Sequence, residues 1–168
     1  MTVAQPDNVT HRANGLDPGG RSHMSGPTKT PESVIERFSA ALQAGQLDDL
    51  VKLFEPDVVV LPATGVGPIT GLARIREALG RIAALRLTMT NDIRHVVVAG
   101  DIAVVYNSWQ LTGTGPDGSP VEMAGVSGDV VRRRDDGWGM LIHDPLGPPT
   151  DGKRDPAPTE AAARAGGH

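Results

Sequence analysis

The sequence predicts an α+β domain in which three helices precede a curved and mostly antiparallel sheet. Two observations support this fold class. The stretch from Ile93 to Leu146 contains β-rich runs divided by Gly, Asp and Pro, a spacing typical of an antiparallel meander. Three helical patterns come before it, so helices are expected to cover one face of the sheet. Such a sheet forms a cone with an apolar interior, which is a natural pocket for a small molecule.

The first two helices are marked by their end signals. Thr30 is suited to cap the first helix, which begins at Pro31 and ends at Gly45. The second helix follows directly, and we expect Phe54 on its buried side and Pro56 at its end.

A short strand and a third helix come next. The strand covers residues 57–61, and Thr70 is expected to cap a helix over residues 72–82. Gly125 and Gly128 lie inside a later strand, where glycines often mark a bulge or a sharp bend. The long strands are expected at residues 87–98, 102–112, 121–133 and 138–144.

Composition separates one foldable domain from two polar ends. Residues 1–29 and 147–168 are rich in Gly and Pro and have few apolar residues, so we expect both ends to be disordered. The folded domain is therefore expected at residues 30–146. Met24 is an alternative to Met1 as the translation start, because the residues before it add nothing foldable.

Charge and residue usage argue against several classes of partner. The net charge of -4 and the pI of about 5.7 disfavour nucleic acid and anionic membranes. The basic run 132–134 adjoins two aspartates and is expected to be a solvated strand end. The chain has no cysteine and its histidines lack metal-binding spacing, so we expect no metal and no other cofactor. We also expect a cytoplasmic location, since the sequence has neither a signal-peptide pattern nor an apolar run near the ~20 residues of a membrane span.

The chain also resembles a known superfamily over about residues 31–145. The residues that carry the resemblance are Arg37-Phe38 to Gly45, Leu50, Leu53-Phe54 and Pro56-Asp57, Gly67-Pro68 to Ile75, Trp109 to Gly118, Val131 to Arg133, Asp136 to Trp138, and His143 to Pro145. They are similar to those of the NTF2-like superfamily, which includes SnoaL-type polyketide cyclases, ketosteroid isomerases and limonene epoxide hydrolases. Within this superfamily, the residue pattern most resembles that of SnoaL-like and DUF4440-type domains. The resemblance implies a cone-shaped NTF2-like fold, with helices roofing the sheet.

The resemblance does not extend to the catalytic residues of the ketosteroid isomerases. That mechanism needs a tyrosine in the first helix, an aspartate after the short strand and an aspartic acid in the third long strand. The matching positions hold Phe38, Leu61 or Pro62, and Val126. Phe38 has no hydroxyl, and neither Pro62 nor Val126 can transfer a proton. The Asp-Arg-Asp pattern of the epoxide hydrolases has no counterpart that can be placed.

His143 is the leading candidate for chemistry. It lies on the last strand, and alignment by the turn at residues 136–138 directs it into the expected pocket, where a histidine can act as a general base or acid. Asp144 is expected on the opposite face. Asp129 is the second candidate, and it either pairs with an arginine or enters the pocket through a bulge at Gly128. The alternative for His143 is a structural histidine that is hydrogen-bonded within the pocket wall.

The expected ligand-binding residues are Trp109, Asn107, Met123, Val126 and Phe38. Trp109 and Asn107 share one face of a strand and suit an apolar ligand that carries a carbonyl or hydroxyl group. The alternative is that Trp109 belongs to the core, that Asn107 satisfies a strand bulge and that Met123 is plain packing.

Tyr106, Ser108 and Gln110 lie on the opposite face of that strand. In the superfamily that the chain resembles, the convex face of the sheet commonly forms a dimer interface. The resemblance therefore implies a homodimer through these three residues.

Three functions remain open from the sequence. The leading hypothesis is a pocket that binds a small hydrophobic molecule, with cyclase or isomerase chemistry in which His143 carries the proton and Asn107 hydrogen-bonds an enolate oxygen. The alternative is a non-catalytic module that dimerises or sequesters a ligand. A third is a hydrolase with an activated water, which needs a carboxylate beside His143, and Asp129 is the nearest candidate.

Overall fold

The computed structural model describes residues 27–62 and 67–147. In chain order its elements are α1 (Pro31–Ala44), α2 (Leu47–Lys52), β1 (Phe54–Val60), β2 (Ile69–Thr70), α3 (Leu72–Ala83), β3 (Thr88–Ala99), β4 (Ile102–Thr114), β5 (Pro120–Arg134) and β6 (Gly137–His143). The predicted α+β fold with a curved, mostly antiparallel sheet is confirmed. The predicted disorder of the two ends concerns mainly residues 1–26 and 148–168, which lie outside the described residues.

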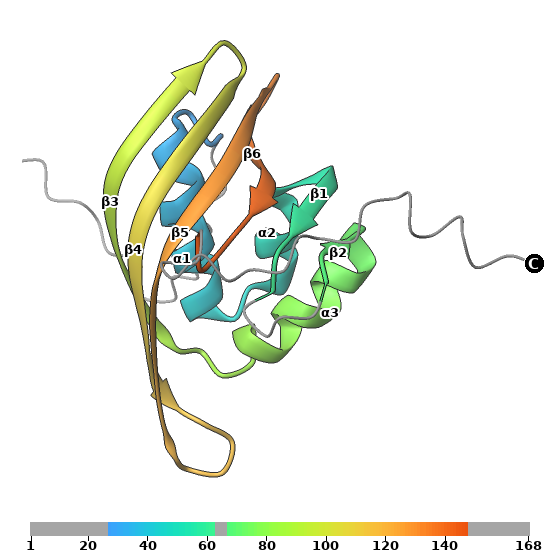
Figure 1. Ribbon diagram of the computed structural model, residues 1–168. Coiled ribbons are helices and arrows are strands. Elements are labelled where there is room, and N and C mark those ends of the chain that lie inside the picture. Colours follow the sequence, from blue (N-terminus) through green and yellow to red (C-terminus); the bar gives the residue numbers. More distant parts are fainter. Residues whose placement is uncertain (1–26, 63–66, 148–168) are drawn as a thin grey trace, which may run out of the picture.

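The six strands form a single sheet in the order β2-β1-β6-β5-β4-β3. Neighbouring strands pair antiparallel, except that β1 runs parallel to β6. Figure 1 shows the long strands β3, β4 and β5 curving in front of α1, while α3 lies beside β1 and β2. The face of the sheet that α1 covers is called the concave face below, and the opposite face is called the convex face.

Local signals at the two ends of α1 define this helix as predicted. The Thr30 side chain accepts a hydrogen bond from the backbone N–H of Ser33, and the Ser33 hydroxyl oxygen accepts one from the backbone of Thr30. Gly45 ends the helix in the left-handed region at φ 67°, a conformation that costs glycine little. Between these ends the apolar side of α1 is buried against the sheet.

Three predictions about the ends of the second and third helices were wrong. Phe54 is the first residue of β1 and not part of a helix, and Pro56 lies inside that strand. The proline is tolerated because the pairing of β1 with β6 is irregular between Phe54 and Val59. Thr70 belongs to β2 and does not cap α3, whose N-cap residue is Gly71, without a side-chain hydrogen bond.

The interior glycines of β5 do not form bulges, and one of them, Gly125, serves close packing. The pairing of β4 with β5 keeps one register past both Gly125 and Gly128. A Cβ atom on Gly125 would lie 2.8 Å from the Trp109 ring, so the missing side chain makes room for the indole. The sheet has its irregularities elsewhere, between Ile93 and His95 and between Val130 and Val131.

The packed chain begins before Thr30. Thr28, which falls in the N-terminal extension expected from the sequence, is buried and forms a parallel bridge with Gly137 at the start of β6. Its backbone oxygen accepts a hydrogen bond of 2.9 Å from the Trp138 N–H. Residues 27–29 therefore belong to the described fold.

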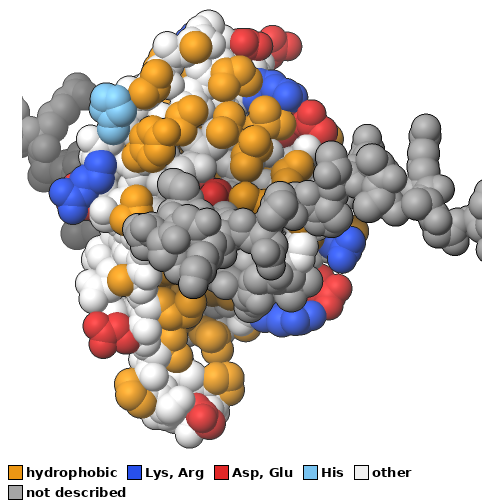
Figure 2. All heavy atoms as spheres, viewed as in Figure 1, with side chains coloured by type: hydrophobic (Ala, Val, Ile, Leu, Met, Phe, Trp, Pro, Cys, Tyr) orange, Lys and Arg blue, Asp and Glu red, His pale blue; other side chains and the backbone are white. Residues whose placement is uncertain are grey.

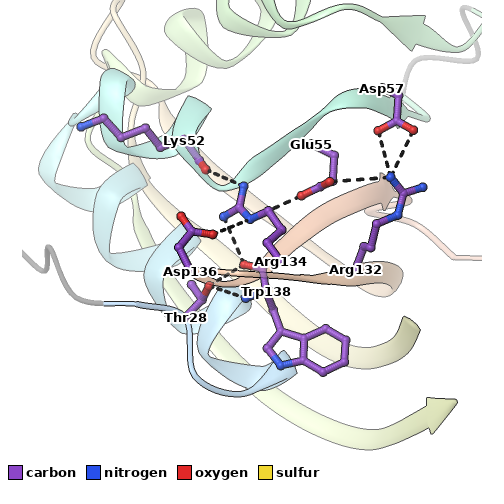
Figure 3. Close-up of polar contacts among 8 residues, drawn as sticks. All are labelled: Thr28, Lys52, Glu55, Asp57, Arg132, Arg134, Asp136 and Trp138. Carbon is purple, nitrogen blue, oxygen red and sulfur yellow. Dashed lines mark hydrogen bonds and ion pairs between the residues drawn. The ribbon is translucent and has the colours of Figure 1, made fainter. Parts of the chain in front are cut away.

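Two arginines of the predicted basic run, Arg132 and Arg134, are paired with carboxylates (Figure 3), whereas Arg133 lies over the Trp138 ring. Glu55 is buried, with its carboxylate 3.7 Å from Arg132 Nη1 and 3.5 Å from Arg134 Nε. Two exposed carboxylates complete the pairs, Asp57 at 3.3 Å from Arg132 and Asp136 at 3.2 Å from Arg134. The run is thus an ion-paired network and not merely a solvated strand end.

Gly139 leaves the space in which the Glu55 carboxylate lies. A Cβ atom there would be 2.2 Å from Glu55 Oε1 and 2.8 Å from Arg134 Cζ. We therefore expect Gly139→Ala to lower the free energy of unfolding by about 1–3 kcal/mol, because the buried carboxylate must move away from its arginines. Urea denaturation measures the change.

Gly128→Ala is the matched control for this substitution. A Cβ atom at Gly128, also in a strand interior, would meet only the Tyr106 ring at an ordinary 3.7 Å. This control is expected to change the stability by no more than about 0.5 kcal/mol. Equal stabilities of the two variants would contradict the role given to Gly139.

Candidate functional site

A cavity of about 350 Å³ lies between the concave face of the sheet and helices α1 and α3. Most of its lining is apolar, contributed by Ile35, Phe38, Leu42, Val60, Pro62, Ile69, Ala78, Leu79, Ile82, Leu85, Leu87, Met89, Trp109, Leu111, Val121, Met123, Met140 and Pro145. Four polar residues also line it, namely Asn107, Ser127, Asp129 and His143. A cavity of this size and composition is typical of sites for small apolar molecules.

The polar residues come from three neighbouring strands. In the antiparallel pairing Asn107 of β4 lies opposite Ser127 of β5, and Asp129 follows two residues later on the same face. His143 ends the next strand, β6. The four side chains therefore form one polar patch in an otherwise apolar wall.

Asp129 and His143 form a hydrogen-bonded pair within this patch. His143 Nδ1 lies 2.7 Å from Asp129 Oδ1, and the Ser127 hydroxyl donates a bond of 2.7 Å to Asp129 Oδ2. Asp129 is 1% exposed, so solvent cannot hydrogen-bond its carboxylate oxygens. The bonds to His143 and Ser127 take the place of solvent at these two atoms. When Nδ1 carries the proton of the neutral ring, Nε2 is the basic nitrogen.

Aromatic rings fix the position of the imidazole. The Phe38 ring lies 5.3 Å from the His143 ring at a tilt of 44°, and the Phe54 ring lies 6.2 Å away at 73°. These contacts, together with the bond to Asp129, restrain both the plane and the rotation of the histidine.

Asn107 belongs to a second hydrogen-bonded chain, which runs from the cavity to α1. Its Nδ2 donates a bond of 2.9 Å to Asn91 Oδ1, and Asn91 Nδ2 donates to Ser39 Oγ. The Ser39 hydroxyl in turn donates a bond of 3.0 Å to the Ile35 carbonyl. Asn107 Oδ1 is buried and has no hydrogen-bond partner among the described residues.

This arrangement does not fit the enolate-binding role expected for Asn107. An enolate oxygen requires a donor, whereas the atom that Asn107 leaves without a partner is an acceptor. Asn107 lies opposite Ile93 and Ser127, and the register shift of β3 between Ile93 and His95 falls directly beside it, so the alternative in which Asn107 serves a strand bulge stays open.

Trp109 forms part of the cavity wall, and its polar atom is already engaged. The indole Nε1 donates a bond of 2.6 Å to the Pro145 carbonyl. The indole therefore offers a ligand its apolar ring rather than a hydrogen bond. Met123 and Phe38 also line the cavity, as predicted.

Val126 was wrongly assigned to the ligand-binding wall. It pairs with Ser108 on the convex face and is 51% exposed. The regular alternation of β5 turns Ser127 and Asp129 inward instead, so Asp129 enters the cavity without a bulge at Gly128. Val126, which was matched to the aspartic acid of the ketosteroid isomerases, therefore does not face the cavity. Asp129 of the same strand does.

The chain matches a family model described as a SnoaL-like domain over residues 35–138. The chain belongs to the SnoaL-like domain family. The match runs from Ile35 of α1 to the start of β6 and includes most of the cavity lining, but not Met140 or Pro145. His143 lies beyond the matched residues.

Solved structures of similar fold extend the comparison. A Thiobacillus denitrificans protein provisionally named a calcium/calmodulin-dependent protein kinase type II association domain is 25% identical, with a TM-score of 0.59 over 71% of this chain and 98% of that one. A protein of the NTF2-like family from Streptomyces avermitilis, provisionally named a dehydratase, is 22% identical, with a TM-score of 0.55 over 68% and 95%. A ketosteroid isomerase-like protein from Erwinia carotovora is 16% identical, with a TM-score of 0.59 over 67% and 88%. The SnoaL-like chain therefore has the NTF2-like fold that was predicted.

Within residues 27–62 and 67–147, no group of three or more His, Asp or Glu side chains is arranged to hold a metal ion. None of the described helices is long and apolar enough to cross a membrane.

Proposed function

We propose that this SnoaL-like protein binds a small hydrophobic molecule and moves a proton on it with the His143–Asp129 pair. The observation that carries the proposal is the 2.7 Å contact between His143 Nδ1 and the buried Asp129 carboxylate, in the wall of an apolar cavity. A histidine oriented in this way is a suitable general base for a cofactor-independent isomerase or cyclase.

The proposed step uses only groups of this chain and the ligand. His143 Nε2 takes a proton from a carbon next to a carbonyl group, which leaves an enolate and an imidazolium ion. The Asp129 carboxylate stabilises the imidazolium through Nδ1–H, and the Ser127 hydroxyl holds the carboxylate in place. Return of the same proton to another carbon completes an isomerisation. In a cyclisation the enolate carbon attacks a second carbonyl of the ligand, and the imidazolium returns its proton to the alkoxide that forms.

Two alternatives are ranked below this one. A hydrolase with an activated water also needs the carboxylate beside His143, but it further needs an acid for the leaving oxygen. The described lining of the cavity contains no ionisable side chain beyond Asp129 and His143. A ligand-sequestering module would use the same cavity without turnover, and the next experiment separates it from an enzyme.

The base can be tested without knowing the natural substrate. 5-Nitrobenzisoxazole is a small apolar molecule that loses its ring C–H proton to a base as its N–O bond breaks, which gives a coloured phenolate. We expect the wild-type protein to accelerate this reaction over buffer. His143→Gln should slow the reaction by at least about tenfold, and Asp129→Asn should also slow it, because general base catalysis contributes about 10²–10⁴-fold. Absorbance of the phenolate reports the rate.

His95→Gln is the matched control. His95 is exposed, lies opposite Tyr106 on the convex face and stacks on its ring at 6.4 Å. This variant should keep the wild-type rate. Equal rates for His143→Gln and His95→Gln, or a wild-type protein no faster than buffer, would contradict the catalytic proposal and favour the sequestering module.

We further propose that two copies of the chain associate through the convex face. Exposed apolar side chains gather there, among them Val97, Tyr106 and Val126 at 47%, 40% and 51% exposure. Figure 2, which views the face turned away from α1, shows hydrophobic side chains over the upper part of the sheet. The word "association" in the name of the Thiobacillus denitrificans protein also supports this proposal. Ser108 and Gln110 share the convex face with Tyr106.

A charge on the convex face should break such a dimer. Val126→Lys is expected to convert a wild-type dimer into a monomer, because an ammonium group would be buried without a partner. Val98→Lys is the control, since Val98 is 54% exposed but lies opposite buried Ala103 of the concave side. Sedimentation equilibrium measures the mass. A monomeric wild type, or a dimeric Val126→Lys, would contradict the interface.

A further inference from the structure

Asn107 Oδ1 is the one buried polar atom that the described cavity lining leaves without a hydrogen-bond partner. Asn107 is 1% exposed and lies among apolar side chains. An unpaired acceptor in such a place is unfavourable, and most buried polar groups in folded proteins are paired. The cavity therefore lacks a hydrogen-bond donor at this atom.

The orientation of the Asn107 amide follows from the chain of bonds behind it. The Ile35 backbone oxygen can only accept, so the Ser39 hydroxyl at 3.0 Å must donate to it. Ser39 Oγ then accepts from Asn91, which must turn its NH₂ group toward the serine. Asn91 therefore presents its oxygen to Asn107, and Asn107 Nδ2 donates to that oxygen at 2.9 Å.

The reverse orientation is disfavoured at the serine. If both amides were flipped, Ser39 would donate to Asn91 Oδ1, and its own oxygen would face the Ile35 carbonyl with two lone pairs opposed. A helix carbonyl thus sets the direction of every bond in the chain, and the side-chain carbonyl of Asn107, a residue of the cavity lining, is left without a donor.

We infer that the ligand is an apolar alcohol or phenol whose hydroxyl group donates a hydrogen bond to Asn107 Oδ1. This inference rests on the proposed function, because it concerns the ligand of the same cavity. The hydroxyl lies in the polar patch with His143 and Asp129, which places the reacting part of the ligand at that end. The rest of the molecule packs on the apolar walls, including the Trp109 ring.

Ser39 has a positioning role in this scheme. It is buried on α1, and the described lining of the cavity does not include it. It selects the ligand indirectly, since its hydroxyl fixes which end of the Asn107 amide faces the cavity. Without that hydroxyl both amides are able to flip, and the preference for a donor should weaken.

The test compares two naphthalenes of nearly equal size. 2-Naphthol carries a donor, whereas 2-methylnaphthalene carries no polar group. Isothermal titration calorimetry at pH 7 gives the ratio of their dissociation constants for the wild type and for Asn107→Leu, Ser39→Ala and His95→Gln. Because each ratio is compared with that of the wild type, the different hydration of the two probes cancels.

We expect Asn107→Leu to lower the preference for 2-naphthol by at least about fivefold, the magnitude of one lost hydrogen bond to a buried group. Ser39→Ala should lower it by at least about twofold, and His95→Gln, on the convex face outside the cavity, should leave it unchanged. If Asn107→Leu does not fold, Ser39→Ala decides the question. In that case a third probe is added, 2-methoxynaphthalene, whose oxygen can accept a hydrogen bond but cannot donate one. Its affinity relative to that of 2-naphthol should be higher for Ser39→Ala than for the wild type.

Other results overturn the inference in distinguishable ways. If both probes bind and the ratio is the same in all four proteins, Asn107 does not select a donor, and the proposed proton transfer is unaffected. If neither probe binds the wild type, both this inference and the proposed binding of apolar molecules fail.

Discussion

The antiparallel pairing of β4 with β5 is the constraint on which the site depends. Its register runs without interruption from Ile102 opposite Arg132 to Thr114 opposite Pro120. This regularity turns Asn107, Ser127 and Asp129 to the concave face, where α1 and α3 close a cavity over them. A shift by one residue would turn these side chains outward and bring valines such as Val104 and Val126 into the cavity.

Two hydrogen-bonded chains bring polar groups into this apolar wall. One joins Ser127, Asp129 and His143, and it leaves the carboxylate with a partner at each oxygen. The other runs from the Ile35 carbonyl through Ser39 and Asn91 to Asn107, and it ends in an atom without a partner. The first chain is suited to move a proton, and the second is suited to recognise a donor. The two chains differ in the acceptor that orients them, which is the Asp129 carboxylate between two partners in the first and the Ile35 backbone carbonyl in the second.

Much of the fold could be predicted from the sequence because its signals are local. The Thr30 and Gly45 ends of α1, the Gly and Asp turns and the alternation along β4 each depend on neighbouring residues only. Phe54 and Pro56 were misplaced because a parallel partner, β6, continues the strand through a break in register that no local pattern reveals. Gly125 was expected to mark a bulge or a sharp bend, whereas its role depends on the Trp109 ring of the next strand.

The site was predictable only in part for a similar reason. The strand face of Trp109 and Asn107 and the inward direction of His143 followed from alternation and from resemblance. The pairing of Asp129 with His143 depends on how β5 meets β6, where the register shifts between Val130 and Val131. The relay through Ser39 joins residues 52 positions apart and cannot be read from spacing.

The measurement that most directly tests this account is a long-range ¹H–¹⁵N NMR spectrum of the His143 imidazole, assigned with the His143→Gln variant. The account requires Nδ1 to carry a proton toward Asp129 and Nε2 to be the unprotonated, basic nitrogen. That pattern, lost in Asp129→Asn, is the predicted result. A ring with its proton on Nε2 and a bare Nδ1 would contradict the proposed base, because the nitrogen that faces Asp129 would then be the only acceptor.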